Sequence, residues 1–363
     1  MGFLIIHSDQ TPNPLQPVLN SADVRWVASV AAAQQACSVD RGDLVIAANL
    51  SQADEIRRLD PLIDVVLAVP AQDSGIDAKA ALRAGVADIW GPEDVGSRAA
   101  TALMGRVQAR QQAIRDRMRR YESEVRRDQR NGRYVQFGML PPNPMMIGDY
   151  ALRHRIVPSA ELSGDFVDYF QLAQQYLVAY VADVAGHGAS SAFVTVLLKN
   201  FSRRIRREYR VDMLQNPGLI LAWLNRELLE QKIDKHVTMA LLLIDLRTDT
   251  LLHANAGHYP QVIKVEETGQ AHFLEASGKP VGLFPEVAYT PVSAHLSPGS
   301  RLVVFSDGVL ELLPEESLAG KEQRLLAAAK TGDRIDDVWS ALGFTAGMQG
   351  PDDISCLIVS REP

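Results

Sequence analysis

The chain has 363 residues, of which 47% are hydrophobic and 22% charged, and its formal net charge is −7. This balance is ordinary for a globular protein and excludes a disordered or collagen-like chain. At roughly 100–200 residues per domain, the length predicts two domains or one large one. The only cysteines, Cys37 and Cys356, are far apart in the sequence, which excludes a disulfide framework and a zinc site made of cysteines.

The longest apolar runs are of strand length, far short of the ~20 residues that a membrane span needs. The first residues, Met1–Ile6, are too few for the core of a signal peptide and are not preceded by basic residues. We therefore expect a cytoplasmic protein with no membrane partner.

Charge divides the chain into three parts. Residues 1–105 carry 7 basic and 13 acidic side chains, residues 106–133 carry 10 arginines and 4 acids, and residues 134–363 carry 20 basic and 27 acidic side chains. Such a shift in composition marks a boundary. We predict a first domain at 1–102, a helical linker at 103–133 and a second domain at 134–363.

The first block alternates short apolar runs with segments of helical spacing, which is typical of a doubly wound, parallel α/β sheet. The predicted strands are Phe3–His7, Leu44–Ala48, Asp64–Val69 and Ala87–Trp90, and the predicted helices include Ala28–Cys37 and Ala78–Ala84.

Residues 80–93 resemble the fourth helix and fifth strand of response-regulator receiver domains, a flavodoxin-like fold, and residues 43–48 resemble the third strand. The resemblance places the phosphoryl acceptor at Ala48 and the partner lysine at Gly91, and only Asp9 remains of the acidic pair. Alanine has no oxygen that could be phosphorylated. We therefore predict a pseudo-receiver that aspartyl phosphate cannot switch, with an unrelated small α/β domain as the alternative.

The linker carries a stripe of mostly apolar residues at alternating spacings of three and four, surrounded by charge. Its members are Met104, Val107, Gln111, Ile114, Met118, Tyr121 and Val125. This heptad pattern predicts a parallel coiled coil and hence a homodimer, with a solvated connecting helix as the alternative. The arginines could indicate nucleic acid. We expect no such partner, because Tyr121 is the only aromatic residue among them.

The last block has apolar strands in hairpins with long helices between them, which indicates an α+β sandwich. The predicted strands are Tyr176–Val184, Thr238–Leu246, Leu251–Ala254, Gln261–Val265, Ala271–Leu274, Arg301–Phe305 and Ile354–Val359, and Ala189–Tyr209 is a predicted helix.

Four aspartates, Asp165, Asp183, Asp307 and Asp352, lie beside apolar runs of this block, in segments that contain glycine or another acid. One such residue alone would be a turn former or a helix cap. Four carboxylates gathered at one edge of a sheet repel one another and need a cation. Oxygen ligands favour Mg²⁺ or Mn²⁺ over zinc.

Residues 134–361 resemble the SpoIIE-type branch of the PPM family of metal-dependent serine/threonine protein phosphatases. Eight segments carry the resemblance, in the family's order: Gln136–Pro141, Ser163–Asp168, Ala182–Gly188, Thr238–Asp245, Asn255–His258, Gly278–Leu283, Ser306–Glu311 and Asp352–Ser355. Ser163 departs from the family, which usually has glycine there.

The resemblance implies a site with two metal ions, Mn²⁺ or Mg²⁺. Asp183 would bridge both ions and the Val184 carbonyl would bind one of them. Asp307 and Asp352 would complete the other shell, and Asp165 would bind through coordinated waters. Asp183 and Asp307 are thus the predicted catalytic residues.

Two ions roughly 3.5–4 Å apart lower the pKa of a bridging water, which can then attack phosphorus in line. Asp353 is expected to support the ligands at most, or to form a turn. His187 and His258 are candidate general acids, although the family's Gly-His pairs more often have a structural role. Arg203, Arg204, Arg206 and Arg207 form either a solvated helical face or a docking surface for an acidic partner.

The sequence therefore predicts a phosphatase acting on phosphoserine or phosphothreonine. By resemblance, the substrate would be a phosphorylated STAS-domain anti-sigma-factor antagonist, and a regulatory protein would act through the pseudo-receiver. The alternative is a catalytically inactive adaptor that works by binding other proteins. Such an adaptor should lack several of the acids that are present here. A nucleic-acid-binding response regulator is disfavoured, because no helix-turn-helix is evident.

Overall fold

The structure is a computed structural model that describes residues 3–6, 24–33, 44–59, 63–70, 77–95, 97–186, 188–345, 347–348 and 350–363. Asp9, Cys37 and His187, which the sequence singled out, lie outside these residues. The chain divides into two compact units, Met1–Glu124 and Val125–Pro363, each of which is described by itself. None of the described helices is long and apolar enough to cross a bilayer.

The first unit is built on a parallel sheet. Its elements are β1 (Phe3–Ile6), β2 (Val24–Val27), β3 (Leu44–Ala47), α2 (Leu50–Leu59), β4 (Val65–Ala68), α3 (Ala78–Arg83), β5 (Asp88–Trp90) and the first turns of α4 (Arg98–Phe137). The strand order is β2-β1-β3-β4-β5, and every neighbouring pair is parallel. This is the order of flavodoxin-like doubly wound sheets.

The central strands of this sheet are buried on both faces, as their continuous apolar sequences predict. One face packs against Ala53 and Ile56 of α2. The other packs against Trp90 and against Leu103 and Val107 of α4. The first turns of α4 therefore contribute to the core of this unit, and Val107, a position of the predicted heptad stripe, is among the buried residues.

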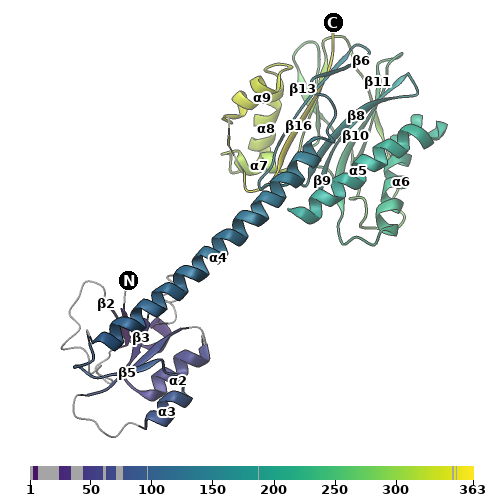
Figure 1. Cartoon of the computed structure of the whole chain (residues 1–363). Coiled ribbons are helices and arrows are strands. Elements are labelled where there is room, and N and C mark those ends of the chain that lie inside the picture. Colours follow the sequence, from purple (N-terminus) through teal and green to yellow (C-terminus); the bar gives the residue numbers. More distant parts are fainter. Residues whose placement is uncertain are drawn as a thin grey trace. The chain divides into compact units, whose positions relative to one another are not determined.

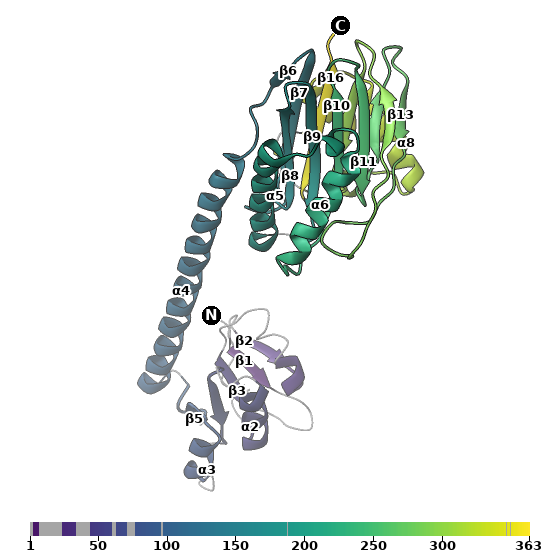
Figure 2. The ribbon, with the colours of Figure 1, turned by 90° about the vertical axis from the view of Figure 1, so that its right-hand side faces the viewer.

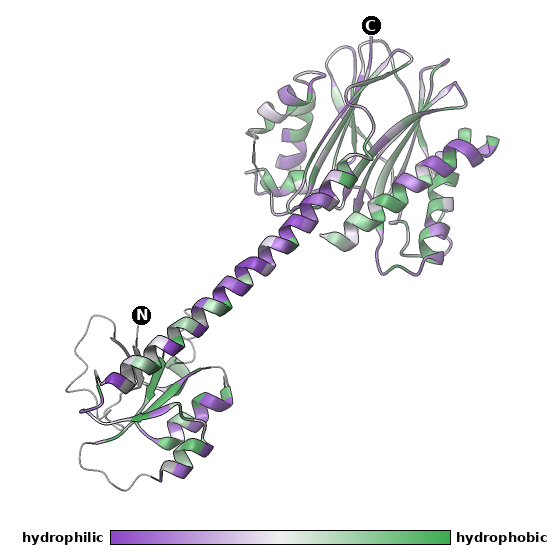
Figure 3. Ribbon diagram, in the orientation of Figure 1, coloured by the Kyte–Doolittle hydropathy of each residue, from purple (hydrophilic) through white to green (hydrophobic). Residues whose placement is uncertain are grey.

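The helix α4 has 40 residues and contains the whole predicted linker. Its surface is mostly hydrophilic (Figure 3). Of the predicted heptad positions, Ile114, Met118, Tyr121 and Val125 are exposed in the single chain. Residues 103–133 thus lie within one helix, while the linker bounds and the coiled coil stay predictions.

The second unit is a sandwich of two sheets. Its strands are β6 (Met145–Ile147), β7 (Tyr150–Val157), β8 (Asp165–Leu172), β9 (Tyr176–Val184), β10 (Val237–Asp245), β11 (Thr250–Ala256), β12 (Val262–Val265), β13 (Ala271–Leu274), β14 (Val292–His295), β15 (Arg301–Phe305) and β16 (Ile354–Arg361). One sheet has the order β14-β11-β10-β9-β8 and the other β13-β12-β15-β16-β7-β6. All of these neighbours pair antiparallel, as the predicted hairpins require.

Helices cover the outer faces of both sheets, which gives four layers (Figures 1 and 2). They are α5 (Ala189–Glu208), the short 3₁₀ helix η1 (Val211–Leu214), α6 (Pro217–Glu230), α7 (Gly308–Leu312), α8 (Leu318–Ala329) and α9 (Ile335–Leu342). Three apolar clusters fill the spaces between α5 and α6 and the first sheet, between the two sheets, and between the second sheet and α8 and α9. The predicted α+β sandwich is confirmed.

Candidate metal-binding site

Asp165 and Asp183 lie opposite each other at one end of the first sheet. Asp165 is the first residue of β8, and the antiparallel register pairs it directly with Asp183 near the end of β9. Directly paired residues project from the same face of a sheet. Thr238 is the partner of Asp183 on β10, and its hydroxyl oxygen lies 3.5 Å from Oδ2 of Asp183.

The second sheet contributes the other two predicted acids at corresponding strand ends. Asp307 follows β15 and is the N-cap of α7, whereas Asp352 lies just before β16. Because β15 and β16 are antiparallel neighbours, the end of one and the start of the other meet at the same edge. The structure therefore brings all four predicted acids to neighbouring strand ends.

Ser306 joins the two sheets at this edge. Its hydroxyl donates to Oδ2 of Asp165 over 2.6 Å and accepts from the backbone N–H of Ser355 over 2.7 Å. Asp165 is 2% exposed, and its other oxygen, Oδ1, has no hydrogen-bond partner in the described structure. A buried carboxylate oxygen without a donor is costly, so this atom is available for a cation or water.

Asp353, expected either to support the ligands or to form a turn, accepts hydrogen bonds on both carboxylate oxygens. Its Oδ1 accepts hydrogen bonds from the backbone N–H and the hydroxyl of Ser159, over 2.7 and 2.9 Å. Its Oδ2 accepts from the backbone N–H of Gly164 over 2.6 Å. A Cβ on Gly164 would lie 3.0 Å from the carbonyl oxygen of Val184, so this close approach requires glycine. Asp353 thus anchors the loop that leads into Asp165.

The acids perturb one another. Loss of hydration, followed by the charges of Asp307, Asp352 and Asp353, raises the pKa of Asp183 to about 7. Burial, followed by the charge of Asp183, raises the pKa of Asp165 well above its ordinary value. Carboxylates shift each other's pKa in this way only when they are close together. The edge therefore concentrates negative charge.

The donor chemistry of this edge fits a hard divalent cation. The available groups are carboxylate oxygens, and the unpartnered Oδ1 of Asp165 is one of them. Such oxygens are the ligands of Mg²⁺ and Mn²⁺. Among the described residues, however, no three His, Cys, Asp or Glu side chains are already arranged to hold one ion. The acids converge without forming a finished ligand cage.

His258 is placed as a support and not as an exposed proton donor. Its ring is buried, with Nε2 2.9 Å from the backbone oxygen of Phe305, two residues before Asp307. Loss of hydration lowers its pKa to about 4, so the ring is neutral near pH 7. The structure offers no support for His258 as the general acid.

Two of the four arginines on α5 make contacts within the fold. Arg204 pairs with Glu227 of α6 over 2.5 Å, and its guanidinium lies 5.0 Å from the ring centroid of Trp223. The guanidinium of Arg206 lies 5.5 Å from the ring centroid of Phe170. These contacts attach α5 to its neighbours, so the two alternatives from the sequence, a solvated face or a docking surface, now concern Arg203 and Arg207.

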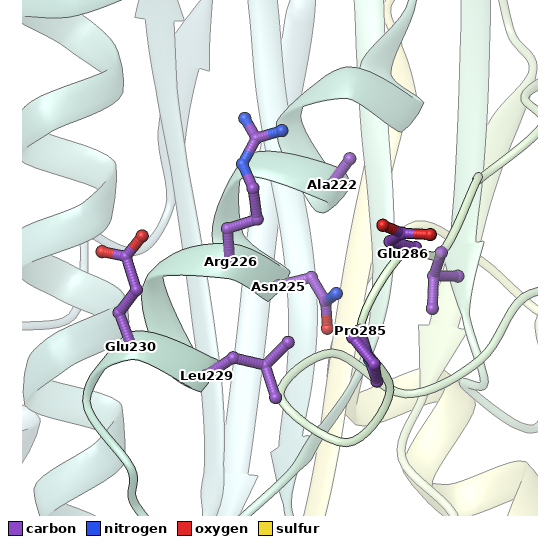
Figure 4. Close-up of a pocket in the computed structure, with 8 residues that line it drawn as sticks. Ala222, Asn225, Arg226, Leu229, Glu230, Pro285 and Glu286 are labelled. Atoms are coloured by element: carbon purple, nitrogen blue, oxygen red, sulfur yellow. The ribbon is translucent and has the colours of Figure 1, made fainter.

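A cavity of about 310 Å³ lies between α6 and the loop at 285–287 (Figure 4). Asn225 points from α6 toward this loop, donating to the carbonyl oxygen of Phe284 and accepting from the N–H of Gly282. It therefore holds the segment Gly278–Leu283 that the family resemblance includes. The predicted acids do not line this cavity, so it is separate from the acidic edge.

Several residues that shape this edge were not predicted from the sequence. Ser306, Thr238 and Gln136 lie in the segments that resemble the family, which was the signal available for them. Their partners are far away in the chain, with Ser306 and Asp165 separated by 141 positions. No local pattern reports such a pairing.

Comparison with known proteins points to one family. The family model described as Stage II sporulation protein E (SpoIIE) matches residues 173–362. The phosphoserine phosphatase RsbP of Bacillus subtilis is 28% identical over 158 residues, which cover 42% of this chain and 38% of RsbP. The phosphoserine phosphatase RsbU of the same organism is 25% identical over 219 residues, which cover 57% of this chain and 62% of RsbU. The chain thus spans less than two thirds of either relative.

A solved structure has a similar fold. The PP2C domain of SiaA from Pseudomonas aeruginosa superposes with a TM-score of 0.55 and 17% identity, covering 67% of this chain and 99% of that domain. At this identity the similarity concerns the fold alone. Since the family model covers more than half of the residues, this chain belongs to the SpoIIE family, with a domain of the PPM phosphatase type.

Proposed function

We propose that this protein is a metal-dependent phosphatase that removes phosphate from phosphoserine or phosphothreonine on a partner protein. The observation that carries the proposal is the gathering of acids from two sheets at one edge, where the pKa of Asp183 rises to about 7. Membership of the SpoIIE family supports it. So do the two relatives that are named phosphoserine phosphatases.

The residues that would hold two ions are the predicted ones. Asp183 would contact both ions and the Val184 carbonyl one of them, while Asp307 and Asp352 would complete a shell and Asp165 would act through waters. When bound, Mn²⁺ or Mg²⁺ would lower the pKa of a coordinated water and neutralise charge on the phosphate.

The chain's own residues would prepare the edge for this chemistry. The hydroxyl of Ser306 donates a hydrogen bond to one carboxylate oxygen of Asp165 and so fixes the orientation of the other oxygen. Asp353 fixes the backbone at Gly164, immediately before Asp165. Burial raises the pKa of the Cys356 thiol, which is fully enclosed and cannot act as a nucleophile. Direct attack by water fits this set of residues.

Substrate and regulation belong to the same proposal. The substrate would be a phosphorylated STAS-domain protein, as the family resemblance of the sequence implies, and the names of the phosphoserine phosphatases RsbU and RsbP agree with a phosphorylated serine as the target. The parallel strand order of the first unit supports a receiver-like domain. Ala48 follows β3 and Gly91 follows β5, at the positions where the resemblance places the phosphoryl acceptor and the lysine. This domain would therefore be regulated by the binding of a protein rather than by aspartyl phosphate.

The test is hydrolysis by the purified full chain. With Mn²⁺, it should release phosphate from phosphoserine or phosphothreonine peptides and from p-nitrophenyl phosphate, and EDTA should stop the release. Asp183→Asn should abolish turnover without unfolding the chain. Asp54→Asn is the matched control, because Asp54 forms an exposed helical pair with Arg58 in the first unit. A wild-type chain that leaves every substrate intact with Mn²⁺ would refute the phosphatase and leave the adaptor.

A further inference from the structure

Gln136 is the next-to-last residue of α4. Its side-chain amide is buried, and both its nitrogen and its oxygen form hydrogen bonds. Its Nε2 donates to the carbonyl oxygen of Ser163 over 2.6 Å and to the hydroxyl oxygen of Thr195 over 2.9 Å. Its Oε1 accepts from the backbone N–H of Ser163 over 3.2 Å. The side chain is 5% exposed. One amide thus binds both backbone groups of Ser163 and also reaches α5.

The direction of the contact with α5 is defined. The Thr195 hydroxyl donates its proton to the carbonyl oxygen of Ala192 over 2.7 Å, so it accepts from Gln136. Thr195 is itself fully buried. The hydrogen bonds of Gln136 therefore satisfy buried polar groups of the Ser163 backbone, and an apolar residue in its place would leave these groups unpaired at a cost in stability.

The backbone that Gln136 holds leads directly into Asp165. The Ser163 hydroxyl accepts from the N–H of Asp165 over 3.1 Å, and Asp353 holds the N–H of Gly164. Ser163, Gly164 and Asp165 are therefore fixed from three sides. The serine that departs from the family's glycine contributes one of these contacts.

The helix α5 that Gln136 also touches begins just after the segment that follows Asp183. Gln136 therefore connects the loop before one acid with the helix after the other. It does so from the end of α4, the helix that contains the whole predicted linker.

We propose that Gln136 is a positioning residue that fixes the Ser163–Asp165 backbone against α5 and thereby sets the affinity of the acidic edge for divalent cations. The inference rests on the proposed function only for the use of the metal. Displacement of the last turn of α4 would loosen the loop before Asp165. A movement of the linker helix would in this way change the position of the acids.

The test compares Gln136→Leu with wild type in the full chain. Leucine has a similar volume but neither donates nor accepts. Backbone hydrogen exchange around Ser163–Asp165 in EDTA should accelerate by about tenfold or more, the change expected from losing interactions worth about 1.4 kcal/mol. The dissociation constant for Mn²⁺, measured by calorimetry, should rise by about tenfold. Excess Mn²⁺ should recover much of the turnover.

Two further variants make the comparison specific. Gln171→Leu is the matched control, because Gln171 is exposed on β8 and its side-chain amide donates to the nearby carbonyl of Gln174. This variant should leave exchange and Mn²⁺ affinity unchanged. Thr195→Val removes the contact with α5 and keeps those with Ser163, so it should shift both readouts in the same direction by less. Thr195→Val carries the test if Gln136→Leu does not fold.

The outcomes separate this inference from the phosphatase. Faster exchange and weaker Mn²⁺ binding in a chain whose wild type hydrolyses no substrate would support the role of Gln136 and refute the proposed function. An active wild type whose Gln136→Leu and Thr195→Val variants exchange and bind Mn²⁺ as wild type does would overturn the role of Gln136 alone.

Discussion

Asp183 carries the pKa shift of the acidic edge to which three neighbouring carboxylates contribute. Its pKa is raised to about 7 by loss of hydration and then by three neighbouring carboxylates. In the unfolded chain the same group titrates near its ordinary value of about 3.9. Ionisation of Asp183 therefore destabilises the metal-free fold as the pH rises through this interval, and a cation would offset the cost.

Asp183→Asn should accordingly stabilise the metal-free protein in a pH-dependent manner. Near pH 8 the variant should exceed wild type by a few kcal/mol in free energy of unfolding, since one pKa unit corresponds to about 1.4 kcal/mol. Near pH 4 most of the advantage should be lost, because the carboxyl is then neutral in the folded state and only about half ionised in the unfolded chain. Urea unfolding in EDTA at both pH values measures the difference. An advantage that does not change with pH would contradict the electrostatic account.

The buried position of His258 leads to a second prediction for a single residue. Because its buried ring contacts the backbone of Phe305, His258→Gln should lower the free energy of unfolding by about 1–3 kcal/mol. The shape of the pH profile of kcat should be preserved. A variant that keeps full stability but loses an ionisation from this profile would show that His258 transfers a proton after all.

Candidate ligands could be predicted from single positions, whereas the contacts that organise them could not. Each acid follows or precedes an apolar run and so has a local signature. Asp353 and Gly164 are separated by 189 positions, and Gln136 and Ser163 by 27. These pairs form because two sheets stack and because α4 ends beside them. Local periodicity in the sequence does not predict such long-range contacts.

Among elements, β8 and α5 are joined by a buried ion pair. Nζ of Lys199 lies 2.9 Å from Oδ1 of Asp168, whose side chain is 2% exposed. Desolvation raises the pKa of Asp168, and the hydrogen bond from Lys199 opposes the shift. The pair ties the strand that begins with Asp165 to the helix that follows Asp183.

Lys199→Met should therefore be strongly destabilising, by about 3–5 kcal/mol, because it leaves a buried carboxylate without its partner. The double variant Lys199→Met, Asp168→Asn should lose less than the sum of the two single changes. Urea unfolding of the wild type, the two single variants and the double variant measures the coupling free energy between Lys199 and Asp168. Additive losses would mean that the pair does not couple the two elements.

Elements with long apolar runs were predictable, and short or polar ones were not. The strands Tyr176–Val184, Ala271–Leu274 and Arg301–Phe305 have the predicted bounds. The helix α2 was missed because it buries only Ala53 and Ile56 among charged neighbours. The strand β2 has four residues, one of them Arg25, too few for a period to show.

The heptad stripe on α4 concerns the assembly of the chain, and its exposure supports the predicted dimer. Ile114, Met118 and Tyr121 are 52%, 56% and 67% exposed in the single chain. A second copy of α4 would cover such a stripe in a coiled coil.

Light scattering of the full chain should therefore give a dimer. Ile114→Glu should yield a monomer, whereas Ser123→Glu, on the same helix but off the stripe, should remain dimeric. A monomeric wild type, or an Ile114→Glu variant that still dimerises, would reduce α4 to a connecting helix.

We propose that acids from two sheets share divalent cations. Equilibrium binding of Mn²⁺ to the full chain, followed by electron paramagnetic resonance of the free ion, tests this proposal. Wild type and Asp54→Asn should bind about two ions per chain, and Asp183→Asn should lose tight binding of both. A wild type that binds no Mn²⁺, or an Asp183→Asn variant that binds it equally well, would contradict the claim.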